Sequence, residues 1–243
     1  VELVPRDIEV LKEEVKTIKE KLNDVDFINI PDLLSCDTRS WDGANIAKAY
    51  FDDVVPHLRA MDFDFTKELP IKDKLREYNI KEVLVIEGDP PQSMLYQVYP
   101  TISTDIIKKF SEEMPEITVY AGIDQYRSSM KEEEYRIRRK QLAGAKGFFT
   151  QPFFDMRYLE MYADLLDGLD IYWGVSPVLS ERSVSYWRNK NNVIFPKDFE
   201  PTLEWNIEFA RKVIEFARKH NHNVYLMPIK AKIMPYLEGV FAK

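Results

Sequence analysis

The sequence predicts an α/β fold, a (βα)8 barrel of the TIM type, built as a single domain from residue 1 to residue 243. Apolar runs of strand length alternate with longer segments of helical period, which is the pattern of repeated βα units around a parallel sheet. The length of 243 residues is typical of one such barrel, and 45% apolar side chains suffice for one substantial core.

Eight strand candidates follow one another along the chain. Strands that are covered by helices on both faces read as continuous apolar runs, and residues 83–86 form such a run. The eight predicted strands are residues 1–4, 27–31, 54–60, 82–88, 118–123, 147–153, 171–177 and 223–229.

The segments between the strands predict helices, because apolar residues recur there at three- and four-residue steps and form one stripe. Residues 180–197 are the least regular part of the chain, and residues 188–192 predict a loop. The first and last stripes are Ile8, Leu11, Val15, Ile18 and Leu22, and Leu203, Ile207, Ala210, Ile214 and Ala217.

An open doubly wound sheet uses the same alternation of strands and helices and is the alternative fold. The count of eight strands favours closure into a barrel. The sequence contains neither a GxGxxG dinucleotide fingerprint nor a GxxxxGK[ST] phosphate loop, so two common nucleotide-binding classes lose their main support.

The charge and cysteine content argue against several partners and locations. With 41 acidic and 34 basic residues the formal charge is −7, which repels a polyanion, so nucleic acid is not an expected partner. The single cysteine, Cys36, cannot form an internal disulfide, which is typical of the reducing cytoplasm. No apolar run approaches the roughly 20 residues that span a bilayer, so no membrane association is expected. The chain begins at Val1 rather than a methionine, which leaves open whether a few native residues precede it.

Polar residues follow several of the predicted strands. In a (βα)8 barrel the reacting groups come from the carboxyl ends of the strands, which meet at one rim. A small-molecule site is therefore expected there. His220 and His222 lack carboxylate or thiol groups at useful spacing, so no metal site is predicted. The polar residues at the predicted strand ends are His57, Asp89, Asp124, Gln125 and Gln151.

Each candidate also has a purely structural explanation. Asp89 lies in a Gly-Asp-Pro-Pro run, which is also typical of a turn, and His57 is also typical of a satisfied core histidine. Glu2 reads as an exposed terminal carboxylate when it is taken alone. Gln151 lies among four phenylalanines, where burial of an unpaired amide is costly, so its side chain either bonds to backbone or faces a ligand.

An ordered set of sequence blocks resembles the methylenetetrahydrofolate reductase family. Residues 1–6, VELVPR, resemble the glutamate-containing opening strand of that family, and Gly88-Asp89 resembles its Gly-Asp loop. Residues 140–145, KQLAGA, followed by residues 150–155, TQPFFD, resemble its most recognisable block. Residues 174–178, GVSPV, match a later strand end, and the order and spacing agree to about residue 196.

The resemblance implies an oxidoreductase of one-carbon metabolism and methionine biosynthesis. Such an enzyme takes hydride from NADH or NADPH and reduces 5,10-methylenetetrahydrofolate to 5-methyltetrahydrofolate through a bound flavin, FAD. By position, the resemblance implies that Glu2 is the general acid that helps to open the folate ring. An acid that works near neutral pH needs a raised pKa, which partial burial on a strand can provide. Asp89 would lie beside the flavin or the pterin, and Gln151 would bind folate.

The resemblance also aligns flavin-contacting positions of the family with His57, Glu133 and Lys140. Two departures bear on this cofactor. Glu87 stands where the family commonly has an arginine, and Arg136 stands where it commonly has an asparagine, although Arg136 keeps a cofactor-binding position. A carboxylate such as that of Glu87 repels the pyrophosphate of FAD, whereas an arginine at the same position attracts it. The departures leave open a relative without flavin, or one that uses a modified pterin.

Two other functions remain as alternatives to the reductase. A folate- or pterin-dependent methyltransferase would keep Asp89 and Gln151 for the pterin without redox chemistry. A non-catalytic pterin-binding subunit would explain the altered flavin positions. In all three cases Glu2, Asp89 and Gln151 are predicted around one cavity, and association into a homo-oligomer is left open.

Overall fold

The computed structural model describes residues 1–91, 93, 95–229 and 231–242. The chain divides into two compact units. The N-terminal unit consists of Glu2–Gly122 and Ile137–Gly147, and the C-terminal unit consists of Val1, Ile123–Arg136 and Phe148–Lys243.

Four parallel strands form the sheet of the N-terminal unit. Their order in the sheet is their order in the chain, and adjacent strands pair in parallel register, such as His57 beside Leu84. All six residues of the second strand are buried, as coverage on both faces requires. The strands are β1 (Ile28–Ile30), β2 (Val54–Arg59), β3 (Glu82–Ile86) and β4 (Thr118–Ile123).

The first predicted strand, residues 1–4, is wrong as a strand. Glu2 forms an isolated parallel bridge with Asn29, and the Leu3 N–H donates to the Asn29 carbonyl at 2.9 Å. Pro5 follows and has no N–H to donate, so pairing cannot continue. The described residues therefore form seven strands, and the bridge keeps Glu2 beside β1.

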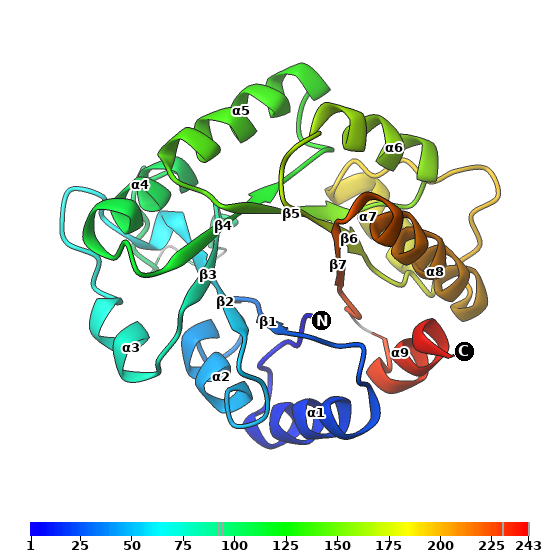
Figure 1. The fold of residues 1–243 in the computed structure, drawn as a ribbon, viewed down its shortest axis with the longest axis horizontal. Helices are drawn as coiled ribbons and strands as arrows, with labels where there is room; N and C mark the ends of the chain where they lie inside the picture. The colour runs from blue at the N-terminus through cyan, green and yellow to red at the C-terminus, as the bar shows by residue number, and fades with distance from the viewer. Residues whose placement is uncertain (92, 94, 230, 243) are drawn as a thin grey trace. The chain divides into compact units, whose positions relative to one another are not determined.

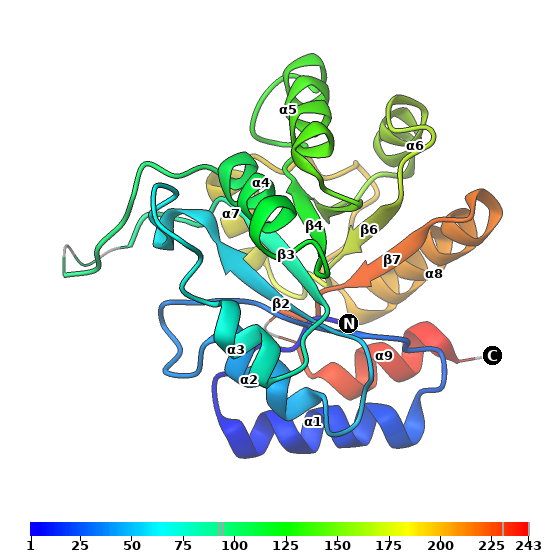
Figure 2. The ribbon, with the colours of Figure 1, turned by 60° about the vertical axis from the view of Figure 1, so that its left-hand side comes forward.

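The helices of the N-terminal unit begin with α1 (Ile8–Lys21), which is capped by Asp7 through bonds from the Glu9 and Val10 N–H groups, both 2.9 Å long. The predicted stripe is confirmed at its centre, where Leu11, Val15 and Ile18 are buried. In both views α1 lies beside α2, which packs on β1 and β2 (Figures 1 and 2). The other helices are α2 (Ser40–Ala47), η1 (Ala60–Asp62), α3 (Lys72–Glu77), α4 (Ser103–Glu113) and α5 (Met130–Ala143), which begins in the C-terminal unit.

The C-terminal unit has three parallel strands in chain order. Helix α8 packs on β6 and β7, and α9 packs on α8 (Figure 1). None of the helices in the described residues is long and apolar enough to cross a membrane. The elements are β5 (Gly147–Pro152), α6 (Met156–Leu165), β6 (Ile171–Val175), α7 (Glu181–Lys190), α8 (Leu203–His220), β7 (Asn223–Leu226) and α9 (Ile233–Phe241).

The predicted loop at residues 188–192 is wrong in its first half, because α7 continues to Lys190. The Ser180 hydroxyl caps this helix by accepting from the Ser183 N–H at 3.2 Å. Val184 is buried in a cluster with Phe154, Val178 and Val193. This packing fixes the helix, although its sequence is mostly polar.

A long connection joins β3 to α4, and its described residues extend away from the strands (Figure 2). It begins with Glu87 and Gly88. The backbone of Gly88 has a φ of +88°, which residues other than glycine rarely adopt. The Met61 N–H donates to the Glu87 carbonyl at 3.3 Å, and the Tyr99 N–H donates to the Met61 carbonyl at 2.8 Å. Both ends of the connection are therefore held by the segment that follows β2.

Candidate functional site

Glu2, Asn29 and His57 lie together in the N-terminal unit. The bridge to Asn29 fixes the backbone of Glu2, and His57 Nε2 lies 3.3 Å from Asn29 Oδ1. The exposed fractions of Glu2, Asn29 and His57 are 8%, 0% and 5%, so Glu2 is not the exposed terminal carboxylate of the structural alternative. Asn29 Nδ2 has no hydrogen-bond partner among the described residues.

Burial keeps His57 neutral. Removal from water lowers its pKa from the ordinary 6.5 to about 3. A neutral imidazole at this position can orient the Asn29 amide, but it does not supply a cation for a phosphate. The placement agrees with the core-histidine explanation of the sequence.

The pKa of His57 predicts a pH dependence of stability. The unfolded chain protonates His57 below about 6.5 and the folded protein only near 3, so the free energy of unfolding falls as the pH drops through that window. Between pH 7.5 and 5.5 the expected contribution is about 1.4 kcal/mol. Urea unfolding of the wild type and of His57→Gln at both pH values measures it. An equal pH dependence in the two proteins would contradict the assignment.

Asp89 follows β3 and presents its carboxylate to solvent. The side chain is exposed, and no hydrogen bond in the described part of the chain uses its carboxylate oxygens. Its main-chain carbonyl accepts from Arg59 Nη2 at 2.8 Å. The backbone is thus held while the carboxylate is available to a ligand.

Gln151 lies near the end of β5 in the C-terminal unit. It is exposed although the other five residues of its strand are buried. Its backbone carbonyl accepts from Gln125 Nε2 at 2.7 Å and from the Thr150 hydroxyl at 2.9 Å. No hydrogen bond of the described residues uses its amide side chain. The predicted burial of this amide is therefore wrong, because solvent can satisfy it, and folate binding by Gln151 stays a prediction.

Glu133 and Arg136 interact with each other on α5. Glu133 is 1% exposed and accepts from the Asp124 N–H at 3.2 Å. Arg136 Nη1 lies 3.6 Å from Glu133 Oε2, and Arg136 Nη2 donates to Glu132 at 2.6 Å. The guanidinium therefore faces carboxylates on its own helix.

Lys140 lies further along α5, in the N-terminal unit. It is 8% exposed, and its ammonium donates to the Gly122 carbonyl at 2.6 Å. This bond joins the helix to the end of β4. Lys140 thus has a structural contact in addition to the role that the resemblance implies.

The position of Glu87 bears directly on the predicted FAD. Its carboxylate accepts from the Ser103 N–H at 3.1 Å and from the Ser103 hydroxyl at 2.7 Å, at the first residue of α4. A helix N-terminus of this kind attracts anions, and here a protein carboxylate already satisfies it. Neither Glu87 nor the buried, neutral His57 therefore offers a cation to the phosphates of FAD. Flavin binding stays a prediction that an absorbance spectrum tests.

Sequence reasoning missed a pocket at the carboxyl ends of β6 and β7. Its volume is about 520 Å³. It was missed because residues 180–197 show no regular period, whereas α7 presents Tyr186 and Trp187 to it. The lining residues are Pro177, Arg182, Ser183, Tyr186, Trp187, Asn191 and Ile229.

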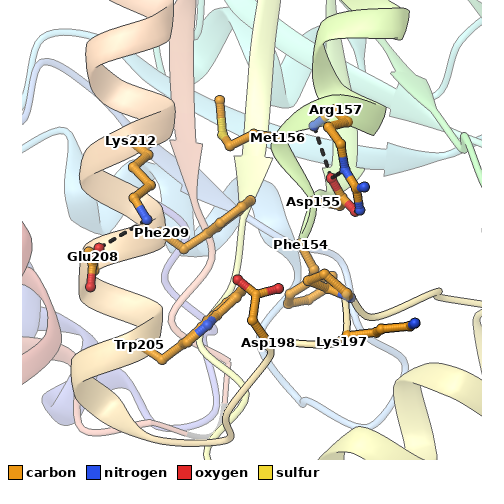
Figure 3. Close-up of a pocket in the computed structure, with 11 residues that line it drawn as sticks. Phe154, Asp155, Met156, Arg157, Lys197, Asp198, Trp205, Glu208, Phe209 and Lys212 are labelled. Carbon is orange, nitrogen blue, oxygen red and sulfur yellow. Dashed lines mark hydrogen bonds and ion pairs between the residues drawn. The ribbon is translucent and has the colours of Figure 1, made fainter.

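A second groove of about 550 Å³ lies beside the start of α6 and the first half of α8 (Figure 3). The Trp205 and Phe209 rings stack 5.2 Å apart on one wall. The ion pairs Arg157–Asp155 at 2.6 Å and Lys212–Glu208 at 2.9 Å neutralise charges along it. Such a mixed lining does not select a class of ligand. Among the described residues no group of three His, Cys, Asp or Glu side chains is placed to hold a metal ion.

Sequence comparison finds one informative relative. No protein-family model matches the chain. Over 147 residues, 58% of the chain, it is 22% identical to a 5,10-methylenetetrahydrofolate reductase of Buchnera aphidicola subsp. Schizaphis graminum. The match spans 50% of that enzyme, so the chain covers about half the length of this relative. The similarity agrees with the family resemblance of the sequence blocks.

Solved structures show the fold. An uncharacterized protein from Clostridium thermocellum that binds two copies of 5-methyl-5,6,7,8-tetrahydrofolic acid matches with a TM-score of 0.65 and 13% identity, over 99% of this chain and 91% of that one. A 2,3-dimethylmalate lyase of the PEP mutase/isocitrate lyase superfamily matches with a TM-score of 0.54 and 12% identity, over 98% and 86%. The predicted α/β barrel class is therefore confirmed, and the open doubly wound alternative is set aside.

Proposed function

We propose that this protein binds a reduced folate and acts in one-carbon chemistry. The observation that carries the proposal is the exposure of two polar side chains, the Asp89 carboxylate in the loop after β3 and the Gln151 amide near the end of β5. A carboxylate can accept from the N–H groups of a pterin, and an amide can both donate and accept. The names of the reductase relative and of the methyltetrahydrofolate-binding structure support the same ligand class.

The reaction that we propose is reduction of 5,10-methylenetetrahydrofolate to 5-methyltetrahydrofolate. Glu2 would donate a proton to the folate nitrogen that leaves the methylene carbon, which opens the five-membered ring to an iminium ion. Hydride from NADH or NADPH then adds to that carbon, so that NAD⁺ or NADP⁺ and 5-methyltetrahydrofolate are the products. The proton and the hydride together balance the reaction.

The residues of the chain contribute position and proton transfer. Glu2 is buried beside β1, with an exposed fraction of 8%. The bridge to Asn29 restricts its backbone, which reduces the entropy that orientation costs.

A second candidate is a folate barrel without redox chemistry, either a methyltransferase or a binding subunit. The contact of Glu87 with the first turn of α4 favours it, because this carboxylate replaces the cation expected beside a flavin phosphate. The two candidates differ in what happens to 5-methyltetrahydrofolate. A methyltransferase passes the methyl group to a thiol or corrinoid, whereas a binding subunit leaves it unchanged.

Calorimetric titration with 5-methyltetrahydrofolate tests the ligand class. We expect binding by the wild type, and binding roughly tenfold to a hundredfold weaker in Asp89→Asn and in Gln151→Leu, because each loses a hydrogen-bonding group. Asp73→Asn and Gln141→Leu, which change exposed helical residues, should bind normally. Absence of binding in the wild type would overturn the proposal. Oxidation of NADH or NADPH with 5,10-methylenetetrahydrofolate then separates the reductase from the second candidate.

A further inference from the structure

Four charged side chains form a continuous chain across the loops that follow β1 and β2. Arg39 Nε and Nη2 donate to the two Asp32 oxygens at 2.9 and 2.5 Å, and Arg39 Nη2 also donates to Asp62 at 3.0 Å. Arg59 Nε lies 3.3 Å from both oxygens of Asp62. The two arginines and two aspartates of this group have no net charge together, so their partial burial is less unfavourable.

Arg59 is the end of this chain that reaches the Asp89 loop. It is the last residue of β2, it is 6% exposed, and its Nη2 donates to the Asp89 carbonyl at 2.8 Å. Nε faces Asp62, and Nη2 faces the Asp89 carbonyl and Met61 Sδ, which lies 3.3 Å away. Two of the three guanidinium nitrogens of Arg59 are thus placed to hold the loop.

The Asp89 loop also rests on the hydrocarbon stem of Arg59. A Cβ on Gly88 would lie 3.1 Å from Arg59 Cβ and 3.2 Å from Met61 Cγ. The loop therefore needs a residue without a side chain at this point, in addition to the positive φ of Gly88. Packing and hydrogen bonding act on the same two residues, Gly88 and Asp89.

We infer that Arg59, held in place by the Asp32–Arg39–Asp62 chain, is a positioning residue that sets where Asp89 presents its carboxylate to the folate. The inference rests on the proposed function. It gives a role to Arg59, which lies outside the sequence blocks that resemble the reductase family. Arg59 acts through the backbone of Asp89, because it bonds to the main-chain carbonyl and leaves the carboxylate available. Small displacements of a binding group are expensive, so loosening of this loop weakens binding without removing any group that touches the ligand.

Two variants of the charged chain test the inference. Arg59→Met keeps the apolar stem and removes every donor, and Asp62→Asn keeps the shape while it removes the charge that orients Arg59. We expect 5-methyltetrahydrofolate to bind roughly tenfold more weakly to Arg59→Met than to the wild type. The loss of affinity in Asp62→Asn should be smaller. The matched control is Arg76→Met, since Arg76 is an exposed arginine of the same unit that pairs with Glu116 at 3.3 Å. It should bind as the wild type does.

A double-mutant cycle separates positioning from a general loss of structure. In an Asp89→Ala background the Arg59→Met change should have little further effect on affinity, because the group that Arg59 positions is gone. Additive losses in the cycle would overturn the inference.

Amide hydrogen exchange provides a readout that does not need folate. The Met61 amide, which bonds to the Glu87 carbonyl, should exchange faster in Arg59→Met than in the wild type or in Arg76→Met. If the wild type binds no folate, the proposed function fails while the exchange rates still decide whether Arg59 holds the loop. Unchanged exchange in Arg59→Met overturns the inference whatever the ligand.

Discussion

Glu2→Gln is expected to lower turnover of 5,10-methylenetetrahydrofolate with NADH or NADPH by roughly 10²- to 10³-fold, because an amide cannot act as the general acid of ring opening. The substitution is nearly isosteric, so the buried position 2 keeps its packing and the main-chain pairing with Asn29. Affinity for 5-methyltetrahydrofolate should change little, since this product needs no further proton. Steady-state kinetics and calorimetry on the same preparation measure the two effects.

The control for this variant is Glu9→Gln. Glu9 is an exposed residue of the same unit that pairs with Lys12 at 2.7 Å, so its substitution should leave turnover unchanged. Equal turnover in Glu2→Gln and the wild type would remove Glu2 from the mechanism. Loss of affinity in parallel with turnover would instead assign Glu2 to binding.

Gly174→Ala is expected to produce the largest loss of stability. A Cβ on this residue of β6 would lie 2.5 Å from the Thr150 carbonyl oxygen and 2.9 Å from the Gln151 carbonyl oxygen. It would also lie 2.8 Å from Met227 Cε. The side chain of Met227 can move, but the two carbonyls belong to the adjacent strand, and Thr150 also accepts from the Gly174 N–H through its hydroxyl at 2.8 Å. We expect the free energy of unfolding to fall by about 3 kcal/mol.

Urea unfolding of Gly174→Ala against Gly122→Ala tests this steric argument. A Cβ on Gly122 would meet a single neighbour, Ile86 Cγ2, at 3.4 Å, which is close to ordinary contact. The control should lose less than about 1 kcal/mol, as tolerated small-to-large changes do. Similar losses of unfolding free energy in both variants would show that the loss comes from replacing glycine as such, rather than from the contacts with the two carbonyls. Since the Gln151 backbone is one of the groups displaced, Gly174→Ala should also weaken folate binding.

The periodicity of apolar residues was enough to predict the fold class and seven of the eight strand positions. Continuous apolar runs such as residues 83–86 identify strands that are buried on both faces, and the α1 stripe identifies the covered side of a helix. Two predictions failed where tertiary contacts override local sequence. Residues 1–4 pair through a single bridge because Pro5 ends the pairing, and α7 extends through a polar segment because Val184 and Trp187 pack against Phe154.

The candidate site was predictable where a residue type and a strand end coincide, as for Asp89 and Gln151. The contacts that hold these residues were not predictable, because they join positions far apart in the chain. Arg39 reaches Asp62 across 23 residues, and Arg59 reaches the Asp89 carbonyl across 30. The predicted cavity shared by Glu2, Asp89 and Gln151 stays a prediction. The use of FAD and of NADH or NADPH stays a prediction as well.

The side-chain amide nitrogen of Asn29, Nδ2, meets no acceptor within the described chain, and the residue is wholly buried. Leaving such a buried donor without a hydrogen bond costs about 1–3 kcal/mol of stability. A molecule that reaches it with a carbonyl or carboxylate oxygen recovers this energy, whereas a hydrocarbon of the same shape does not. An oxygen-bearing group is therefore preferred over a hydrocarbon as the neighbour of this amide.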